Sequence, residues 1–173
     1  MLMDDSKRDA RLSGAKSLAD HGLELDINGP PASLPFTAKL AAEIPALRIV
    51  INHLGSSGAP DALKPEWKDN IRLVAKQPNV FMKVSALVEQ VKCEPGMAPR
   101  DTDYYLPILD HLWDSFGPDR LIFGSNWPVS DKGAPYEVVF GIVKDYFTAK
   151  GTEACEKYFW KNSLAAYRWT ERK

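Results

Sequence analysis

His53 offers the most chemistry in this 173-residue chain. It directly follows the apolar run Arg48–Asn52, and a histidine at the end of a buried strand can act as a metal ligand, a general base or an oxyanion donor. The alternative is a structural histidine that hydrogen-bonds a neighbouring loop, and the sequence leaves both interpretations open. A zinc site needs three or four ligands, so His53 cannot form one alone. His21 precedes the first predicted strand, and His111 lies within a predicted helix, where a surface or packing role is expected.

Two pairs of polar residues end other apolar runs. Lys83 and Ser85 flank Val84, and alternate residues of a strand point to the same face. Together they could bind a carboxylate or phosphate, or Lys83 could instead extend to solvent. Asp26 and Asn28 form a similar pair, which either binds substrate or begins a polar loop.

The run Gly124–Pro128 (GSNWP) suggests a further ligand contact. The small residues Gly124 and Ser125 allow the backbone to approach a ligand closely. The Asn126 amide can hold a substrate carbonyl, although it cannot act as a general base. Trp127 would add a rigid apolar wall. A tight turn with a buried tryptophan is the alternative.

These residues can meet only if the fold brings several strand ends together. The predicted strands are Leu23–Ile27, Arg48–Asn52, Val80–Val84 and Arg120–Gly124. The predicted helices are Ser6–Asp20, Ser33–Ile44, one opened by Pro65, Asp103–Phe116, one opened by Pro135, Glu153–Trp160 and Ser163–Tyr167, with Ser33 and Asn162 as N-caps. Strict alternation of helix and strand predicts an α/β fold with a parallel sheet, in which the chemistry lies at the carboxyl ends of the strands.

Composition narrows the function classes. The chain is 45% hydrophobic and 26% charged with a net charge of -1, which excludes intrinsic disorder and gives no electrostatic reason to expect nucleic acid or an anionic membrane as partner. We find no apolar run of about 18 residues, the length that spans a bilayer. The first residues lack the apolar core of a signal peptide, so a cytoplasmic protein is expected. Cys93 and Cys155 are predicted to be free thiols.

Four motifs together resemble a known family. They are INHLG (Ile51–Gly55), PNVFMKVSAL (Pro78–Leu87), FGPDRLIFGSNWPV (Phe116–Val129) and FWKNSLAAYRW (Phe159–Trp169). In this order they resemble the amidohydrolase-related (amidohydrolase 2) metal-dependent hydrolases, the TIM-barrel group that includes L-fuconolactonase and 2-pyrone-4,6-dicarboxylate lactonase. The resemblance implies that residues 1–173 are the C-terminal half of a (β/α)8 barrel, equivalent to strands five to eight with the C-terminal helices.

The resemblance also implies an activity and a site. A member of this family would direct water onto a lactone or a related ester or amide carbonyl of a small molecule, either with a divalent metal (Zn or Mn) or without one. His53 matches the family's sixth-strand histidine, a catalytic or metal-binding residue. Asn126 stands where the family usually has an aspartate base, so Asp131 becomes the nearest candidate carboxylate. The expected substrate-binding residues are Asp26, Asn28, Lys83, Ser85, Ser125 and Trp127.

Two other interpretations remain open. The HxH motif of the family's first strand has no counterpart here, which suggests a half barrel without independent catalysis. Such a half barrel would leave its edge strands open and its inner face exposed. It would then form a homodimer or pair with an N-terminal half barrel. The second interpretation is a non-catalytic ligand-binding relative, suggested by Asn126.

Overall fold

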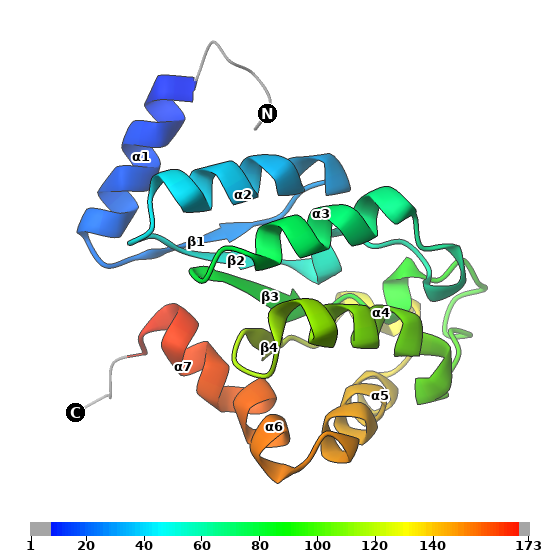
Figure 1. Cartoon of the computed structure of the whole chain (residues 1–173). Coiled ribbons are helices and arrows are strands. Elements are labelled where there is room, and N and C mark those ends of the chain that lie inside the picture. The colour runs from blue at the N-terminus through cyan, green and yellow to red at the C-terminus, as the bar shows by residue number, and fades with distance from the viewer. Residues whose placement is uncertain (1–7, 170–173) are drawn as a thin grey trace.

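The structure is a computed structural model that describes residues 8–169. Four parallel strands form one sheet in the order β1-β2-β3-β4, and helices alternate with them along the chain (Figure 1). The strands are β1 (Glu24–Ile27), β2 (Arg48–Ile51), β3 (Val80–Val84) and β4 (Leu121–Phe123). The helices are α1 (Arg8–Asp20), α2 (Leu34–Glu43), α3 (Pro65–Ala75), α4 (Thr102–Phe116), α5 (Tyr136–Ala149), α6 (Thr152–Glu156) and α7 (Asn162–Tyr167). The predicted α/β fold with a parallel sheet is therefore confirmed. Ser6, the predicted start of the first helix, lies outside the described residues.

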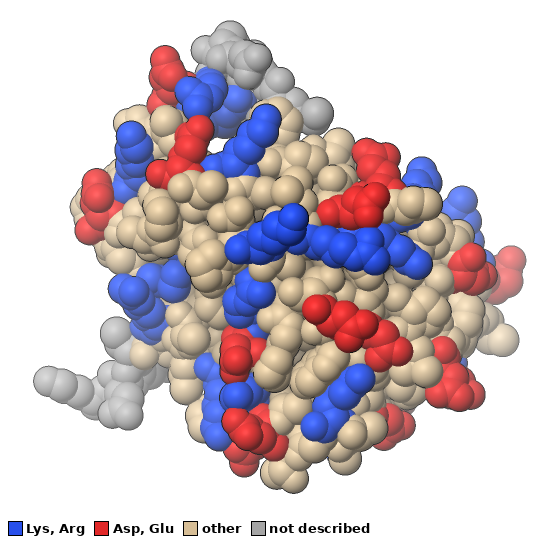
Figure 2. All heavy atoms as spheres, viewed as in Figure 1, with Lys and Arg blue, Asp and Glu red and all other residues tan. Residues whose placement is uncertain are grey.

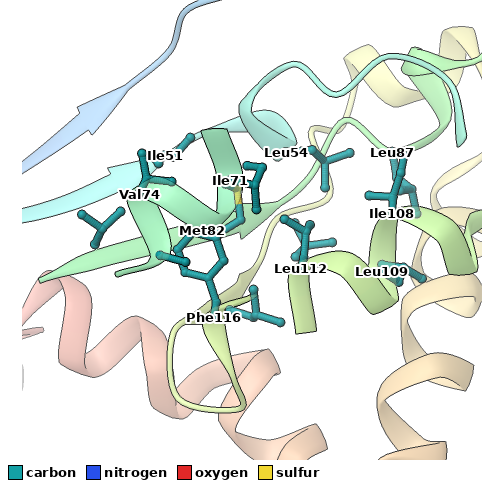
Figure 3. Packing of buried hydrophobic residues seen from close by; sticks show 14 of the residues in the cluster. Ile51, Leu54, Ile71, Val74, Met82, Leu87, Ile108, Leu109, Leu112 and Phe116 are labelled. Carbon is teal, nitrogen blue, oxygen red and sulfur yellow. The ribbon is translucent and has the colours of Figure 1, made fainter. Parts of the chain in front are cut away.

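One face of the sheet holds most of the hydrophobic core. Helices α2, α3 and α4 cover this outer face (Figure 1). Figure 3 shows Met82 of β3 among Ile71 and Val74 of α3 and Leu112 and Phe116 of α4. All five side chains are almost completely buried. Burial of apolar surface stabilises a fold by about 25 cal/mol per Å², so this layer holds the strands in place.

The C-terminal helix covers part of the inner face of the sheet. Strand side chains alternate between faces, and Val50, Phe81 and Ile122 form a second buried cluster with Ala166 of α7. Arg48 supports this contact because its Nε donates to the Ala166 carbonyl over 2.6 Å. Figure 1 shows α7 on the side of the sheet opposite α2 and α3. The expectation of an exposed inner face is therefore wrong where α7 folds back across it.

Neither predicted N-cap residue makes a capping hydrogen bond with its side chain. Ser33 occupies the N-cap position of α2, which starts at Leu34, but its hydroxyl donates to the Pro30 carbonyl. Asn162 lies inside a continuous helix, because a π-helical turn (Lys157–Lys161) joins α6 to α7. Its buried amide donates to the carbonyls of Pro118 and Leu121, both over 2.8 Å. Tertiary partners thus use the side chain that local sequence assigned to a helix end.

The surface and the cysteines carry little further information on function. Figure 2 shows acidic and basic side chains interleaved over the visible face of the molecule. Cys93 and Cys155 are free thiols, as predicted. Among the described helices, none has both the length and the apolar character needed to cross a membrane.

Candidate functional site

The carboxyl ends of the strands bring several of the predicted residues together. In the parallel register, Asp26 of β1 pairs with Val50 and Lys83 of β3 pairs with Ile122, so both polar side chains share the inner face with that cluster. The Lys83 ammonium lies 3.1 Å from the Asp26 carboxylate. An ion pair therefore joins the first and third strands across the inner face of the sheet.

His53 is held by a residue that follows β3. Its Nδ1 lies 2.9 Å from the Ser85 hydroxyl, which leaves Nε2 as the nitrogen available to a ligand. Burial lowers the pKa of His53 below its ordinary value of 6.5, the charge of Lys83 lowers it further, and Glu89 and Asp26 oppose the shift. The ring is therefore neutral at neutral pH, the state in which an imidazole can accept a proton, donate one hydrogen bond or coordinate a metal.

Backbone strain gathers at the same edge. Six non-glycine residues have positive φ within residues 8–169, and five of them follow β2, β3 or β4 closely. The five are His53, Leu54, Ser56, Ala86 and Asn126. Each such conformation costs of order 1–3 kcal/mol and persists only where the surrounding structure enforces it, which is characteristic of binding and catalytic sites.

Tyr167 joins this group from the far end of the chain. Its hydroxyl donates to Asp26 over 3.0 Å, and the Lys83 ammonium lies 5.4 Å from the centre of its ring. Burial raises the pKa of Tyr167, and the Asp26 carboxylate raises it further, so the phenol stays protonated. No local pattern in the sequence selects Tyr167, because it reaches the site only when α7 crosses the inner face.

Asn126 contacts a carboxylate that sequence reasoning also missed. Its Nδ2 donates to Oε1 of Glu89 over 2.6 Å. Glu89 lies in a short 3-10 turn (Val88–Gln90) just beyond β3. Its other oxygen, Oε2, is buried without a hydrogen-bond partner among the described residues. The sequence signal for Glu89 is weak, since it consists only of a carboxylate in the loop after a predicted strand.

Gly124 allows the end of β4 to pack closely against Ser85 and Lys83. An added Cβ would lie 2.9 Å from the Ser85 Cβ and 3.1 Å from the Lys83 Cγ, so a side chain has no room there. The next residue, Ser125, accepts a hydrogen bond from the Trp127 backbone N–H through its hydroxyl. Trp127 is 61% exposed, so the alternative of a buried tryptophan is not observed.

Two predicted residues are not drawn into the group. Asn28 and Asp131 are both exposed, and within residues 8–169 no side-chain hydrogen bond joins either of them to the others. Asp131 lies in the 3-10 turn Val129–Lys132 that follows the Asn126 loop. Their predicted roles in binding and catalysis stay predictions.

The other histidines serve structure: His111 Nε2 lies 3.0 Å from the Lys68 carbonyl, and His21 Nδ1 lies 2.8 Å from the Ser17 carbonyl.

The donors at this edge do not meet the needs of a divalent metal. A zinc centre requires three or four nitrogen, sulfur or carboxylate donors. In the described part of the chain, no three histidine, cysteine, aspartate or glutamate side chains are grouped closely enough to hold a metal ion. His53 contributes the only imidazole near these strand ends within residues 8–169. These residues therefore do not form a metal centre by themselves.

A family model for amidohydrolases, Amidohydro_2, matches residues 2–169. The chain belongs to the amidohydrolase family. It is 29% identical over 137 residues to an L-fucono-1,5-lactonase of Burkholderia multivorans, a match that covers 76% of this chain and 46% of the relative. It is also 27% identical over 151 residues to an L-rhamnono-gamma-lactonase of Scheffersomyces stipitis, covering 76% and 44%. The chain thus spans about half the length of these two relatives.

The fold agrees with the family. A crystal structure of an amidohydrolase from Burkholderia multivorans with bound zinc superposes with a TM-score of 0.83 at 25% identity. The match covers 98% of this chain and 63% of that protein. The arrangement of four parallel strands and their helices, including α7, is therefore shared with this amidohydrolase.

Proposed function

We propose that this amidohydrolase chain supplies one side of a site that hydrolyses a lactone of a sugar acid or a related small ester or amide. The observation that supports the proposal is the neutral His53, held by Ser85 beside Lys83 at the carboxyl edge of the sheet. Similarity to relatives named as lactonases of L-fuconate and L-rhamnonate favours the substrate class.

The chemistry follows from charge that develops on the carbonyl oxygen. When water attacks a lactone, that oxygen becomes an oxyanion, and fixed hydrogen-bond donors or cations stabilise it. With Ser85 donating to Nδ1, His53 presents an Nε2–H to the oxyanion, and Lys83 adds a positive charge nearby. Removal of one such donor typically costs a factor of about 10²–10³ in rate.

The other side chains would bind the substrate. Asp26 and Ser125 offer oxygen atoms to sugar hydroxyls, and the exposed Trp127 ring offers an apolar face to the sugar ring. The Asn126 amide offers a further oxygen, because Oδ1 can accept a hydrogen bond while Nδ2 is bonded to Glu89. Asn28 and Asp131 lie exposed at the rim, where they would contact only a substrate that extends outward.

The same hydrolysis could instead be assisted by a divalent metal, Zn or Mn. The similar amidohydrolase structure with bound zinc favours it. A bound metal would act as a Lewis acid on the carbonyl. The described donors are too few to hold the ion by themselves, so a metal site with His53 would need further ligands from outside residues 8–169. The proposal therefore uses no metal in its steps. A cytoplasmic location stays a prediction.

Further strands of the same fold would add beside the two outermost strands of the sheet. In the described sheet, β1 and β4 each pair with one strand. Beside β1, α1 and α2 line an open pocket of about 610 Å³ whose apolar lining includes Leu12, Leu18 and Leu25. The longer relatives contain about as much chain again, and further βα units would fill this position.

Sedimentation analysis tests whether the chain needs such a partner. A stable monomer that hydrolyses lactones alone would refute a required partner, and a homodimer would identify a second copy as the partner.

The decisive experiment compares two histidine substitutions. Wild type, His53→Ala and His21→Ala are assayed on sugar-acid lactones and pyrone lactones, with EDTA and with added Zn²⁺ or Mn²⁺. His21 is exposed and lies before β1, at the opposite edge of the sheet, so His21→Ala controls for loss of an imidazole. We expect His53→Ala to lower kcat/KM by about 10²–10³ and His21→Ala to leave it unchanged. Equal activity of the two variants would refute the site.

A further inference from the structure

We propose that Glu89 is the catalytic carboxylate that moves the proton during lactone hydrolysis, an inference that rests on the proposed function. An amide at position 126 cannot take a proton from water, so the reaction needs a carboxylate elsewhere. Glu89 is the carboxylate that the structure brings into contact with Asn126.

The two oxygens of Glu89 have different surroundings. Oε1 accepts the hydrogen bond from the Asn126 amide over 2.6 Å, which fixes the orientation of the carboxylate. Oε2 is buried and has no partner within the described residues. An unpaired buried oxygen of this kind is unfavourable by about 1–3 kcal/mol or more, and a proton or a bound water would stabilise it. Oε2 is thus the oxygen left free of protein hydrogen bonds, and the proposal assigns it the proton of a water that enters with the substrate.

Asn126 and Glu89 are chemically complementary. An aspartate at position 126 would place two carboxylates at hydrogen-bond distance, and they could not both be ionised without strong repulsion. The amide removes this conflict because it donates to Glu89. The loss of a carboxylate at position 126 is therefore matched by a carboxylate that the Asn126 amide itself positions.

Packing holds this pair rigidly. The turn that carries Glu89 lies against Gly133, where an added Cβ would meet the Val88 Cγ2 at 2.9 Å and the Val88 carbonyl oxygen at 3.0 Å. On the other side, Asn126 is fixed in the left-handed backbone region at a φ of 57°. Close packing of the two loops after β3 and β4 thus keeps the carboxylate in place, as a general base requires.

Glu89 also interacts electrostatically with the proposed oxyanion donor, His53. Its negative charge raises the pKa of His53, against the effects of burial and Lys83, so the two groups lie within electrostatic reach. Asp131 has no comparable relation to the site: it is exposed, and in the described chain its side chain bonds to none of these residues. Of these two carboxylates, Glu89 is therefore the one assigned to proton transfer, because it contacts Asn126 and interacts electrostatically with His53.

The proton balance is simple. As the water oxygen forms its bond to the lactone carbonyl carbon, one water proton passes to Glu89 Oε2. The tetrahedral intermediate then collapses, the bond between that carbon and the ring oxygen breaks, and Glu89 returns the proton to the leaving alkoxide. The product is the open-chain hydroxy acid, which releases its carboxyl proton to solution. Glu89 ends ionised, ready for another turnover, and no oxidant or cofactor is consumed.

The test compares Glu89→Gln with Glu94→Gln in the complete chain, on the lactone that wild type hydrolyses fastest. The amide of Glu89→Gln still accepts from Asn126 but cannot take a proton, whereas Glu94 is exposed in the following loop and serves as the control. We expect Glu89→Gln to lower kcat by about 10²–10⁴, with KM and Tm close to wild type. Formate, a small carboxylate, should restore part of the activity of Glu89→Ala, which a structural role would not allow.

The outcomes separate the two proposals. Wild-type activity combined with normal kcat in Glu89→Gln, or loss of activity in Asp131→Asn instead, would overturn the assignment of Glu89 and leave the proposed function standing. Failure of formate to restore Glu89→Ala would also count against a proton-transfer role. Absence of lactone hydrolysis by wild type under every condition would refute the proposed function, and the role of Glu89 would fail with it.

Discussion

Gly124 lies where β4 ends, against the side chains of Lys83 and Ser85, and Gly124→Ala tests this close approach. The new Cβ would lie 2.9 Å from the Ser85 Cβ and 3.1 and 3.2 Å from the Cγ and Cδ of Lys83. Non-bonded carbon atoms prefer separations of about 3.5–4.0 Å. The flexible lysine can move aside, but the Ser85 Cβ is attached directly to the backbone of the β3 loop. The clash therefore requires a backbone shift of roughly 0.6–1 Å.

This shift sets the size of the effect. Extra methyl groups forced into a packed region typically cost about 1–3 kcal/mol. A domain of this size loses about 3 °C of Tm per kcal/mol, so we expect Gly124→Ala to melt about 3–9 °C below wild type. Gly124 does not have a left-handed φ, so the cost arises from the contact and not from backbone strain. Displacement of Ser85 should also weaken its 2.9 Å bond to His53 and lower lactone turnover.

Gly141→Ala provides the matched control. Gly141 lies inside α5, and the position that its added Cβ would occupy has no neighbouring atom within 4 Å, so a methyl group fits there freely. Alanine is favoured over glycine in a helix by about 0.5–1 kcal/mol, so this variant should melt slightly above wild type. Thermal unfolding followed by circular dichroism measures both. A Gly124→Ala protein as stable as Gly141→Ala would refute the packing argument.

Two other predictions address the C-terminal helix and the histidine. Asn162→Ala removes both hydrogen bonds to carbonyls beside β4 and should lower the free energy of unfolding by about 2–4 kcal/mol; an unchanged urea midpoint would contradict this. His53 should titrate below 6.5, because burial and Lys83 favour the neutral ring over the opposing charges of Glu89 and Asp26. Its contribution to stability is thus complete above pH 6.5 and declines as the pH falls below that value, where the unfolded state binds the proton first. NMR titration in EDTA should show a higher His53 pKa in Lys83→Met, and an unchanged value would exclude the electrostatic effect.

The sequence by itself determined the fold class and much of the candidate site. Alternation of predicted helices and strands indicated a parallel sheet, and β3 was predicted at its observed bounds of Val80–Val84. Because parallel strands end at one edge of a sheet, the same pattern placed His53, Lys83 and Ser85 near one another. The structure shows two contacts among the strand ends, from His53 to Ser85 and from Lys83 to Asp26. Local pattern was sufficient because the periodicity of a strand decides which side chains share a face.

Only the tertiary structure decided which distant side chains complete the group. Tyr167 follows Asp26 by 141 positions and reaches it because α7 crosses the inner face. Glu89 contacts Asn126 because the loops after β3 and β4 pack together, whereas the nearer carboxylate in sequence, Asp131, is exposed. Asn162 was predicted to cap a helix and instead binds two carbonyls at the base of β4. Such contacts depend on how whole elements pack, and the energy of that packing is not encoded in the spacing of neighbouring residues.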